Sequence, residues 1–173
     1  MELITAVKLI QNEYVKNQPI TNWADLGCGS GLFTYALATY LEKGSTIYAV
    51  DTSKQLQDSI TPGGISIKAL QADFVKDVLP IQQLDGILMA NALHYVKDKL
   101  SFIHQTSRYT QSNARFLIVE YDTDKPVKTW VPYPVSFASL ETVFKTAGYS
   151  NIQRLGSHPS VFGNTIYAAI IQK

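Results

Sequence analysis

The segment from Trp23 to Gly31 reads Trp-Ala-Asp-Leu-Gly-Cys-Gly-Ser-Gly, and a helical pattern of apolar residues follows it. Its first half is a short apolar run, and its second half has glycine at alternate positions. This order predicts a strand, a glycine-rich turn and a helix. Glycines at such a turn let a ligand approach the backbone N–H groups where the helix dipole is positive. We expect Ser30 to cap this helix.

The spacing of these glycines narrows the choice of ligand. The dinucleotide-binding fingerprint is G-x-G-x-x-G, whereas this turn reads G-x-G-x-G and has Asp25 two residues before its first glycine. An acidic residue at that place suits a ligand with a cationic amino group better than a pyrophosphate. The segment therefore argues against a nicotinamide cofactor. The aspartate that we expect after the second strand does not decide the question, because nicotinamide-dependent enzymes have an acidic residue there as well.

The composition describes an ordinary globular chain. Its 173 residues are 46% hydrophobic and 17% charged, and the net charge is +1. Without a dense run of Lys and Arg, the charge argues against a large nucleic-acid footprint. The single cysteine, Cys28, excludes an intrachain disulfide. The amphipathic N-terminal segment fits neither a signal peptide nor a membrane span, so we expect a cytoplasmic protein with no membrane partner.

Strand and helix patterns alternate along the chain. We expect strands at 22–26, 46–50, 65–70, 84–90, 115–119, 151–155 and 165–171, and helices at 2–16, 32–41, 53–60, 95–109 and 137–147. Alternation predicts a parallel sheet with right-handed crossovers. The last two strands have no room for a helix between them, so one of them should run antiparallel.

Polar residues end the first four strands. Asp25, Asp51 and Asp73 end or follow the first three, and Asn91 follows the fourth. Each of them alone could cap a helix or a turn. Ligands of open α/β sheets bind outside the carboxyl ends of the strands. Four such residues at successive strand ends, behind a glycine turn, therefore predict a single binding site.

Asp-Leu-Gly-Cys-Gly-Ser-Gly resembles motif I of the class I methyltransferases, which use S-adenosylmethionine (SAM). The resemblance extends through most of the chain. It implies a single-domain α/β fold over residues 1–173: a Rossmann-like three-layer sandwich around a seven-stranded, mostly parallel sheet with one antiparallel strand near the C-terminus. Residues 1–20 would form a helix that covers the cofactor side.

The resemblance also implies cofactor roles. Asp51 would accept hydrogen bonds from both ribose hydroxyls. Asp73 and the N–H of Phe74 would read adenine, and Asp25, Gly27 and Asn91 would hold the methionine end. The full set of expected SAM-binding residues is Asp25, Gly27, Cys28, Gly29, Gly31, Asp51, Thr52, Asp73, Phe74 and Asn91. No metal is expected, and Cys28 has no identifiable base beside it that would make it a nucleophile.

Met89 to Tyr95, Met-Ala-Asn-Ala-Leu-His-Tyr, occupies the place of the family's motif IV. It is not the Asn-Pro-Pro-Tyr or Asp-Pro-Pro-Tyr of enzymes that methylate base amino groups or glutamine, and it resembles the small-molecule branch. We expect Asn91 and His94 to be catalytic, His94 by taking or orienting a proton of the acceptor. The alternative is a structural His94, because methyl transfer from a sulfonium often needs only alignment and desolvation.

The connection from Tyr121 to Ser136, called the strap below, is long for a compact domain and rich in proline and aromatic residues. Long connections are commonly functional, and this one resembles that of small bacterial methyltransferases of unassigned substrate. We expect Tyr121, Trp130 and Tyr133, with Tyr95, to line the acceptor site. The alternative is a rigid cover over the end of the sheet.

The sequence thus predicts a methyltransferase that acts on an O, N or S atom of a small molecule. One alternative is a SAM-binding module without catalysis, and another is an enzyme that methylates RNA or protein. Neither the acceptor nor the oligomeric state follows from the sequence.

Overall fold

The computed structural model describes residues 1–16, 18–127, 130–160 and 165–173. Its elements in chain order are α1 (Leu3–Leu9), β1 (Asn22–Leu26), α2 (Leu32–Ala38), β2 (Thr46–Asp51), β3 (Ser59–Ile60), β4 (Ser66–Gln71), β5 (Leu84–Ala90), the 3-10 turn η1 (Leu93–Tyr95), α3 (Lys99–Thr106), β6 (Thr110–Tyr121), α4 (Phe137–Thr146), β7 (Asn151–Pro159) and β8 (Thr165–Gln172). Among the described residues, no helix is long and apolar enough to cross a bilayer.

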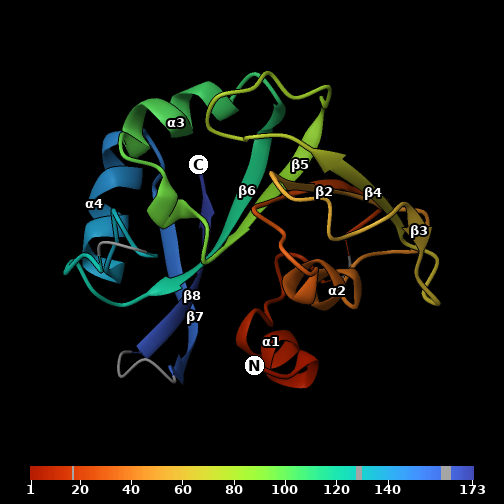
Figure 1. The fold of residues 1–173 in the computed structure, drawn as a ribbon, viewed down its shortest axis with the longest axis horizontal. Coiled ribbons are helices and arrows are strands. Elements are labelled where there is room, and N and C mark those ends of the chain that lie inside the picture. The colour runs from red at the N-terminus through yellow and green to blue at the C-terminus, as the bar shows by residue number, and fades with distance from the viewer. Residues whose placement is uncertain (17, 128–129, 161–164) are drawn as a thin grey trace.

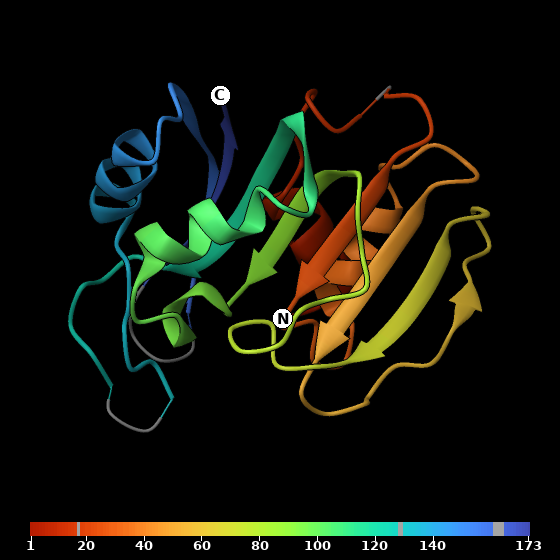
Figure 2. The ribbon, with the colours of Figure 1, turned by 90° about the horizontal axis from the view of Figure 1, so that it is seen from above.

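In the part of the chain that the structure describes, one eight-stranded sheet organises the fold, in the order β3-β4-β2-β1-β5-β6-β8-β7. Strands β4, β2, β1, β5 and β6 are parallel, and β8 runs antiparallel between β6 and β7. Figure 2 shows β3 and β4 at one end of the sheet and the blue strands β7 and β8 at the other. The predicted α/β class and the reversed strand near the C-terminus are confirmed, and the two-residue β3 is an addition.

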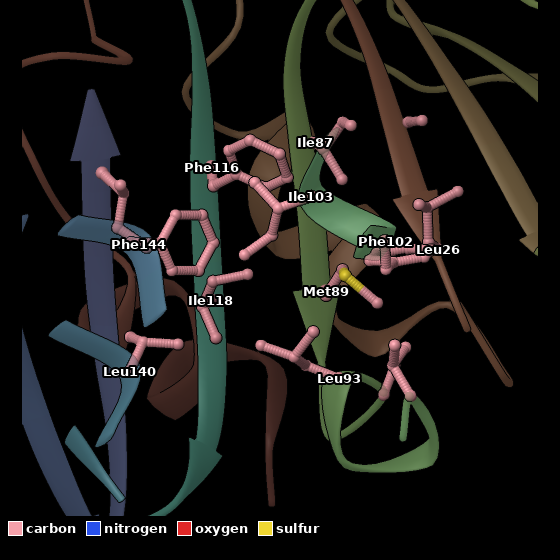
Figure 3. Close-up of a cluster of buried hydrophobic side chains, with 14 of the residues drawn as sticks. Leu26, Ile87, Met89, Leu93, Phe102, Ile103, Phe116, Ile118, Leu140 and Phe144 are labelled. Atoms are coloured by element: carbon pink, nitrogen blue, oxygen red, sulfur yellow. The ribbon is translucent and has the colours of Figure 1, made fainter. Parts of the chain in front are cut away.

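Side chains that alternate along the strands build a core on each face of the sheet. Ile87, Met89 and Phe116 belong to one apolar cluster, whereas the intervening Leu88 and Leu117 belong to the other. Figure 1 shows α3 and α4 on one side of the sheet and α1 and α2 on the other. Figure 3 shows side chains of β5 and β6 meeting those of α3 and α4. The predicted three layers follow from this period-2 burial.

Two predicted helices differ from the observed structure. Residues 53–60 form no helix, because Leu56 is buried in a small cluster with Ile67, and Ser59–Ile60 pairs with β4. The helix expected at 95–109 begins at Lys99, where Asp98 caps it by accepting a 3.0 Å hydrogen bond from the Ser101 N–H. Tertiary pairing decided the first case, and a capping residue decided the second.

The N-terminal helix α1 is shorter than the pattern predicted and packs against α2. Ala6 and Leu9 meet Phe33 and Leu37 in the core of that face. The hydroxyl of Tyr40, just beyond α2, also donates a 2.8 Å hydrogen bond to the Val7 carbonyl. Whether residues 1–20 cover a bound cofactor stays a prediction.

Candidate active site

The glycine turn between β1 and α2 presents an open backbone surface. Gly27, Gly29 and Gly31 all have positive φ angles, of 82°, 51° and 88°. A Cβ on Gly27 would lie 2.6 Å from that of Ala92, so the turn packs closely against the residues after β5. A Cβ on Gly29 would meet nothing within 4 Å among the described atoms. The turn is therefore open on the side of Gly29 where a Cβ would stand, while the Gly29 N–H is already donated to Asp51.

The expected cap at Ser30 is wrong. The N-cap of α2 is Gly31, and none of the described side chains makes a capping hydrogen bond there. The Gly31 N–H instead donates a 2.9 Å hydrogen bond to the Cys28 carbonyl, and Ser30 is exposed. A tight turn within the loop thus replaces the cap.

Burial and the charges of Asp25 and Asp51 raise the pKa of Cys28 to about 12, so it stays a thiol.

Asp25 is a buried carboxyl group with one unsatisfied oxygen. Its Oδ2 accepts a 2.6 Å hydrogen bond from the Thr34 hydroxyl, whereas Oδ1 is buried and has no partner among the described residues. Burial raises the pKa of Asp25 to about 7, the Thr34 hydrogen bond opposes this, and the charge of Asp51 adds to it. An isolated buried charge is costly, so this carboxyl group is poised to gain a cationic partner.

Asp51, at the end of β2, holds the glycine turn as well as facing the cavity described below. Its Oδ2 accepts a 2.9 Å hydrogen bond from the Gly29 N–H, and its Oδ1 accepts bonds of 2.9 and 3.0 Å from the backbone and hydroxyl of Ser53. Partial burial raises the pKa of Asp51, but these hydrogen bonds more than offset it, so the net shift is downward. Thr52 beside it also faces the cavity.

Asp73 begins a turn after β4 and forms an ion pair there that was not predicted from the sequence. It accepts a 2.7 Å hydrogen bond from the Lys76 ammonium and a 3.0 Å bond from the Val75 N–H. The hydrogen bond from Lys76 is the main cause of a lowered pKa for Asp73. Phe74 packs edge-to-face on Phe102 at 5.9 Å between ring centroids, which fixes this turn to α3.

Asn91 follows β5 with a strained backbone, at φ 53°. Its N–H donates a 2.8 Å hydrogen bond to the Val119 carbonyl of β6, which places the residue at the edge of the sheet. Its side-chain Oδ1 is buried and has no partner among the described residues. Strain and an unsatisfied buried acceptor together are typical of a functional position.

These strand ends surround a cavity of about 470 Å³. It is lined by Gly27, Asp51, Thr52, Asp73, Phe74, Val75, Lys76, Asn91, Ala92 and Tyr95. The structure therefore brings together most of the predicted cofactor residues and one predicted acceptor residue, Tyr95. Val75, Lys76 and Ala92 also line the cavity but were not predicted from the sequence, because no distinctive pattern marks them. Asp25, Cys28, Gly29, Gly31, His94, Tyr121, Trp130 and Tyr133 are not among its lining residues.

His94 lies within η1 and is paired with Glu120 at the end of β6. The His94 N–H donates a 3.0 Å hydrogen bond to Glu120 Oε1, and its Nδ1 lies 2.8 Å from Oε2. His94 is 2% exposed and Glu120 is fully buried. Glu120 is not among the site residues predicted from the sequence. The signal was an acidic residue directly after the apolar run 116–119, the same signal that marked Asp25 and Asp51.

Aromatic rings extend from His94 toward the strap. The ring centroids of Tyr95 and Tyr121 lie 4.4 and 6.2 Å from that of His94, and Trp130 lies edge-to-face on Tyr121 at 5.8 Å. The Tyr133 N–H donates a 3.0 Å hydrogen bond to the His94 carbonyl. The strap is thus fixed beside His94, with its residues 128 and 129 outside the described part of the chain.

Comparison with known proteins identifies the family. The methyltransferase domain family matches the sequence over residues 24–118, more than half of the chain. The chain belongs to this family. It is a SAM-dependent methyltransferase. No curated protein sequence matches it.

Solved structures share the fold of this methyltransferase at low sequence identity. One is the 1,6-didemethyltoxoflavin-N1-methyltransferase of Burkholderia thailandensis, solved with 1,6-didemethyltoxoflavin and S-adenosylhomocysteine: TM-score 0.68, 16% identity, covering 99% of this chain and 77% of that one. A SAM-dependent methyltransferase from Aquifex aeolicus gives 0.62 and 16%, covering 99% of both chains. Magnesium protoporphyrin IX methyltransferase from Synechocystis, with bound SAM, gives 0.67 and 15%, covering 99% and 78%.

The site of the methyltransferase fits SAM on features of its own. The open face at Gly29 leaves room for a ligand against the backbone. The unsatisfied oxygens of Asp25 and Asn91 are acceptors, as the ammonium group of the methionine end requires. Asp51 and Asp73 are carboxylates with lowered pKa values. Each oxygen of Asp73 can accept one further hydrogen bond, whereas Asp51 Oδ1 already accepts two and its Oδ2 has one position left for a ribose donor. The individual contacts stay predictions.

Proposed function

We propose that this methyltransferase acts on an O, N or S atom of a small molecule, which binds beside Tyr95 and His94. The observation that carries the proposal is their contrast in exposure. Tyr95 is 51% exposed on the cavity wall, whereas the adjoining His94 is almost fully buried and held by a carboxylate. Tyr95 gives the cavity an aromatic wall, as small-molecule sites commonly have, and His94 lies directly behind that wall, with its ring centroid 4.4 Å from that of Tyr95.

The roles of the chain's own residues follow from this placement. SAM supplies an electrophilic methyl group on a sulfonium. Asp25 and Asn91 orient its methionine end, and Asp51 its ribose. His94 takes the proton of the acceptor, and the strap with Trp130 excludes water from the reacting atoms. The toxoflavin-precursor methyltransferase, whose structure contains its small-molecule ligand, supports such an acceptor by analogy.

The first experiment separates the classes of acceptor. Calorimetry with SAM, S-adenosylhomocysteine and NAD should show binding of the first two ligands only. Transfer from methyl-labelled SAM is then followed with a panel of hydroxyl, amino and thiol compounds, with peptides and with RNA. Label in small molecules supports the proposal, and label only in peptide or RNA contradicts it. Binding of SAM without any transfer would favour a non-catalytic module.

A pair of variants tests the place of the acceptor. In His94→Asn the shorter amide retains a donor near Nδ1 and so keeps a partner for Glu120, but it removes the base. We expect turnover to fall about 10²–10⁴-fold while SAM affinity stays unchanged. The control is His104→Asn, since His104 is exposed on α3. Equal turnover in both variants would make His94 structural.

A further inference from the structure

The pair formed by Glu120 and His94 is a two-point contact in the interior of the protein. One carboxylate oxygen accepts the peptide N–H of His94, and the other meets its ring at Nδ1. Both side chains are almost completely buried, at 0% and 3% exposure. The contact therefore fixes the position of the residue and also the rotation of its imidazole ring.

Packing alone does not require an acidic residue at this position. The backbone N–H of His94 needs one acceptor, which the neutral amide of glutamine would supply with the same shape. Burying a carboxylate is costly unless donors satisfy it. Glu120 also interacts electrostatically with the Lys99 ammonium on α3, with Tyr121 at the end of β6 and with Tyr167 on β8. Lys99 donates its described hydrogen bonds to the carbonyls of Val96 and Tyr133.

We propose that Glu120 is a positioning residue that holds His94 as its Nδ1–H tautomer. A peptide N–H can only donate, so Oε1 must accept, and an ionised carboxylate then accepts at Oε2 as well. Nδ1 therefore carries the proton, because the hydrogen bond at one ring nitrogen sets the state of the other. Nε2 is left with its lone pair, because the side-chain hydrogen bond that His94 makes to a described residue is at Nδ1.

This tautomer specifies the chemical class of the acceptor. A basic Nε2 serves a neutral nucleophile that carries a proton, such as a hydroxyl or a heteroaromatic N–H. As the bond from the acceptor to the methyl carbon forms and the sulfur–methyl bond breaks, that proton passes to Nε2, leaving S-adenosylhomocysteine, the methylated product and an imidazolium stabilised by Glu120. The role of Nε2 as a base rests on the proposed function, whereas the tautomer does not.

A spectroscopic experiment tests the tautomer without any substrate. Long-range ¹H–¹⁵N correlation spectra of the ¹⁵N-labelled protein at neutral pH distinguish protonated from unprotonated ring nitrogens. For His94 we expect a protonated Nδ1 and an unprotonated Nε2, with exposed His104 as the internal reference. A protonated Nε2 in the wild type, whether as the other tautomer or as imidazolium, would overturn the proposal.

Glu120→Gln is the matched variant, because it keeps the shape and removes the charge. Its single oxygen would accept the His94 N–H, so its amide would donate to Nδ1 and force the proton to Nε2. The expected result is a reversed tautomer. With an acceptor from the labelling panel, we also expect kcat to fall about 100-fold, with KM and SAM affinity unchanged, and Glu120→Asp to restore part of it.

The outcomes separate the two proposals. If Glu120→Gln keeps the wild-type tautomer and kcat, Glu120 is only structural. If Glu120→Gln does not fold, the wild-type spectrum still decides the tautomer. Label in peptide or RNA would refute the proposed acceptor while a protonated Nδ1 in the wild type would leave the role of Glu120 standing.

Discussion

The predicted contact between Asp25 and the ammonium group of SAM should make SAM binding weaker as the pH falls. Burial raises the pKa of this carboxyl group from 3.8 to about 7 in the unliganded protein. We expect SAM, through its ammonium group, to bind the ionised form. Below pH 7 binding must first remove a proton, so affinity falls as the pH falls, by up to tenfold for each pH unit.

The size of the effect follows from the same value. At pH 5, two units below the pKa, roughly 1% of Asp25 is ionised, so SAM should bind about 100-fold more weakly than at high pH, a loss of about 2.7 kcal/mol. Asp51 and Asp73 have lowered pKa values and stay ionised across this window. An ordinary α-amino group stays largely protonated below about pH 7.7, so titrations should cover pH 5 to 7.5.

The assay is calorimetric titration of SAM in two buffers of different ionisation enthalpy. For the wild type we expect release of nearly one proton per SAM at pH 5–6, falling to roughly a quarter of a proton at pH 7.5. Asp25→Asn, which keeps an acceptor for the Thr34 hydroxyl, should lose this component and serves as the background. A wild-type affinity that changes less than threefold between pH 5 and 7.5 would refute the reasoning.

The unliganded protein provides an independent check with the sign worked out. The pKa of Asp25 is higher in the folded chain than in the unfolded chain, so protonation of Asp25 favours folding. This stabilising contribution is fully present below pH 3.8 and is lost as the pH rises through 7. Between these two limits the contribution of Asp25 to the free energy of unfolding changes by about 4 kcal/mol. The free energy of unfolding, measured with urea for wild type and Asp25→Asn, should therefore diverge across that range. Parallel profiles would show that Asp25 ionises normally.

Three further variants test the rest of the site. Gly29→Ala should weaken SAM binding at least tenfold by filling the open face of the turn. The control is Gly148→Ala, which is also at positive φ with nothing within 4 Å of an added Cβ, so it should have the same backbone strain of about 1–2 kcal/mol and leave SAM binding unchanged. Equal SAM affinities of the two variants would place the cofactor elsewhere. Asp51→Ala should weaken SAM binding ten- to a hundredfold, and Asp58→Ala, which removes a carboxylate bonded to a backbone N–H outside the cavity, should not. Trp130→Ala should raise KM or lower kcat for the acceptor with little change in SAM affinity; a large drop in melting temperature with normal kinetics would instead make the strap a structural cover.

The sequence by itself determined the part of the site that depends on local patterns. An apolar run followed by alternating glycines specified β1, the turn and α2, and an acidic or amide residue after each of four apolar runs marked Asp25, Asp51, Asp73 and Asn91. These signals suffice because parallel strands bring their carboxyl ends to one edge of the sheet.

Only the tertiary structure decided how distant segments satisfy one another. Residues 53–60 have a helical pattern, but pairing with β4 made part of them a strand. Glu120 and His94 are 26 residues apart, and no sequence pattern in either segment predicts their contact. Lys76 reaches Asp73 only because the chain turns after β4. Hydrogen bonds and ion pairs act over a few ångströms in space and leave no period along the chain, so the contacts that set tautomer, charge and loop shape at this site emerge only when the sheet has assembled.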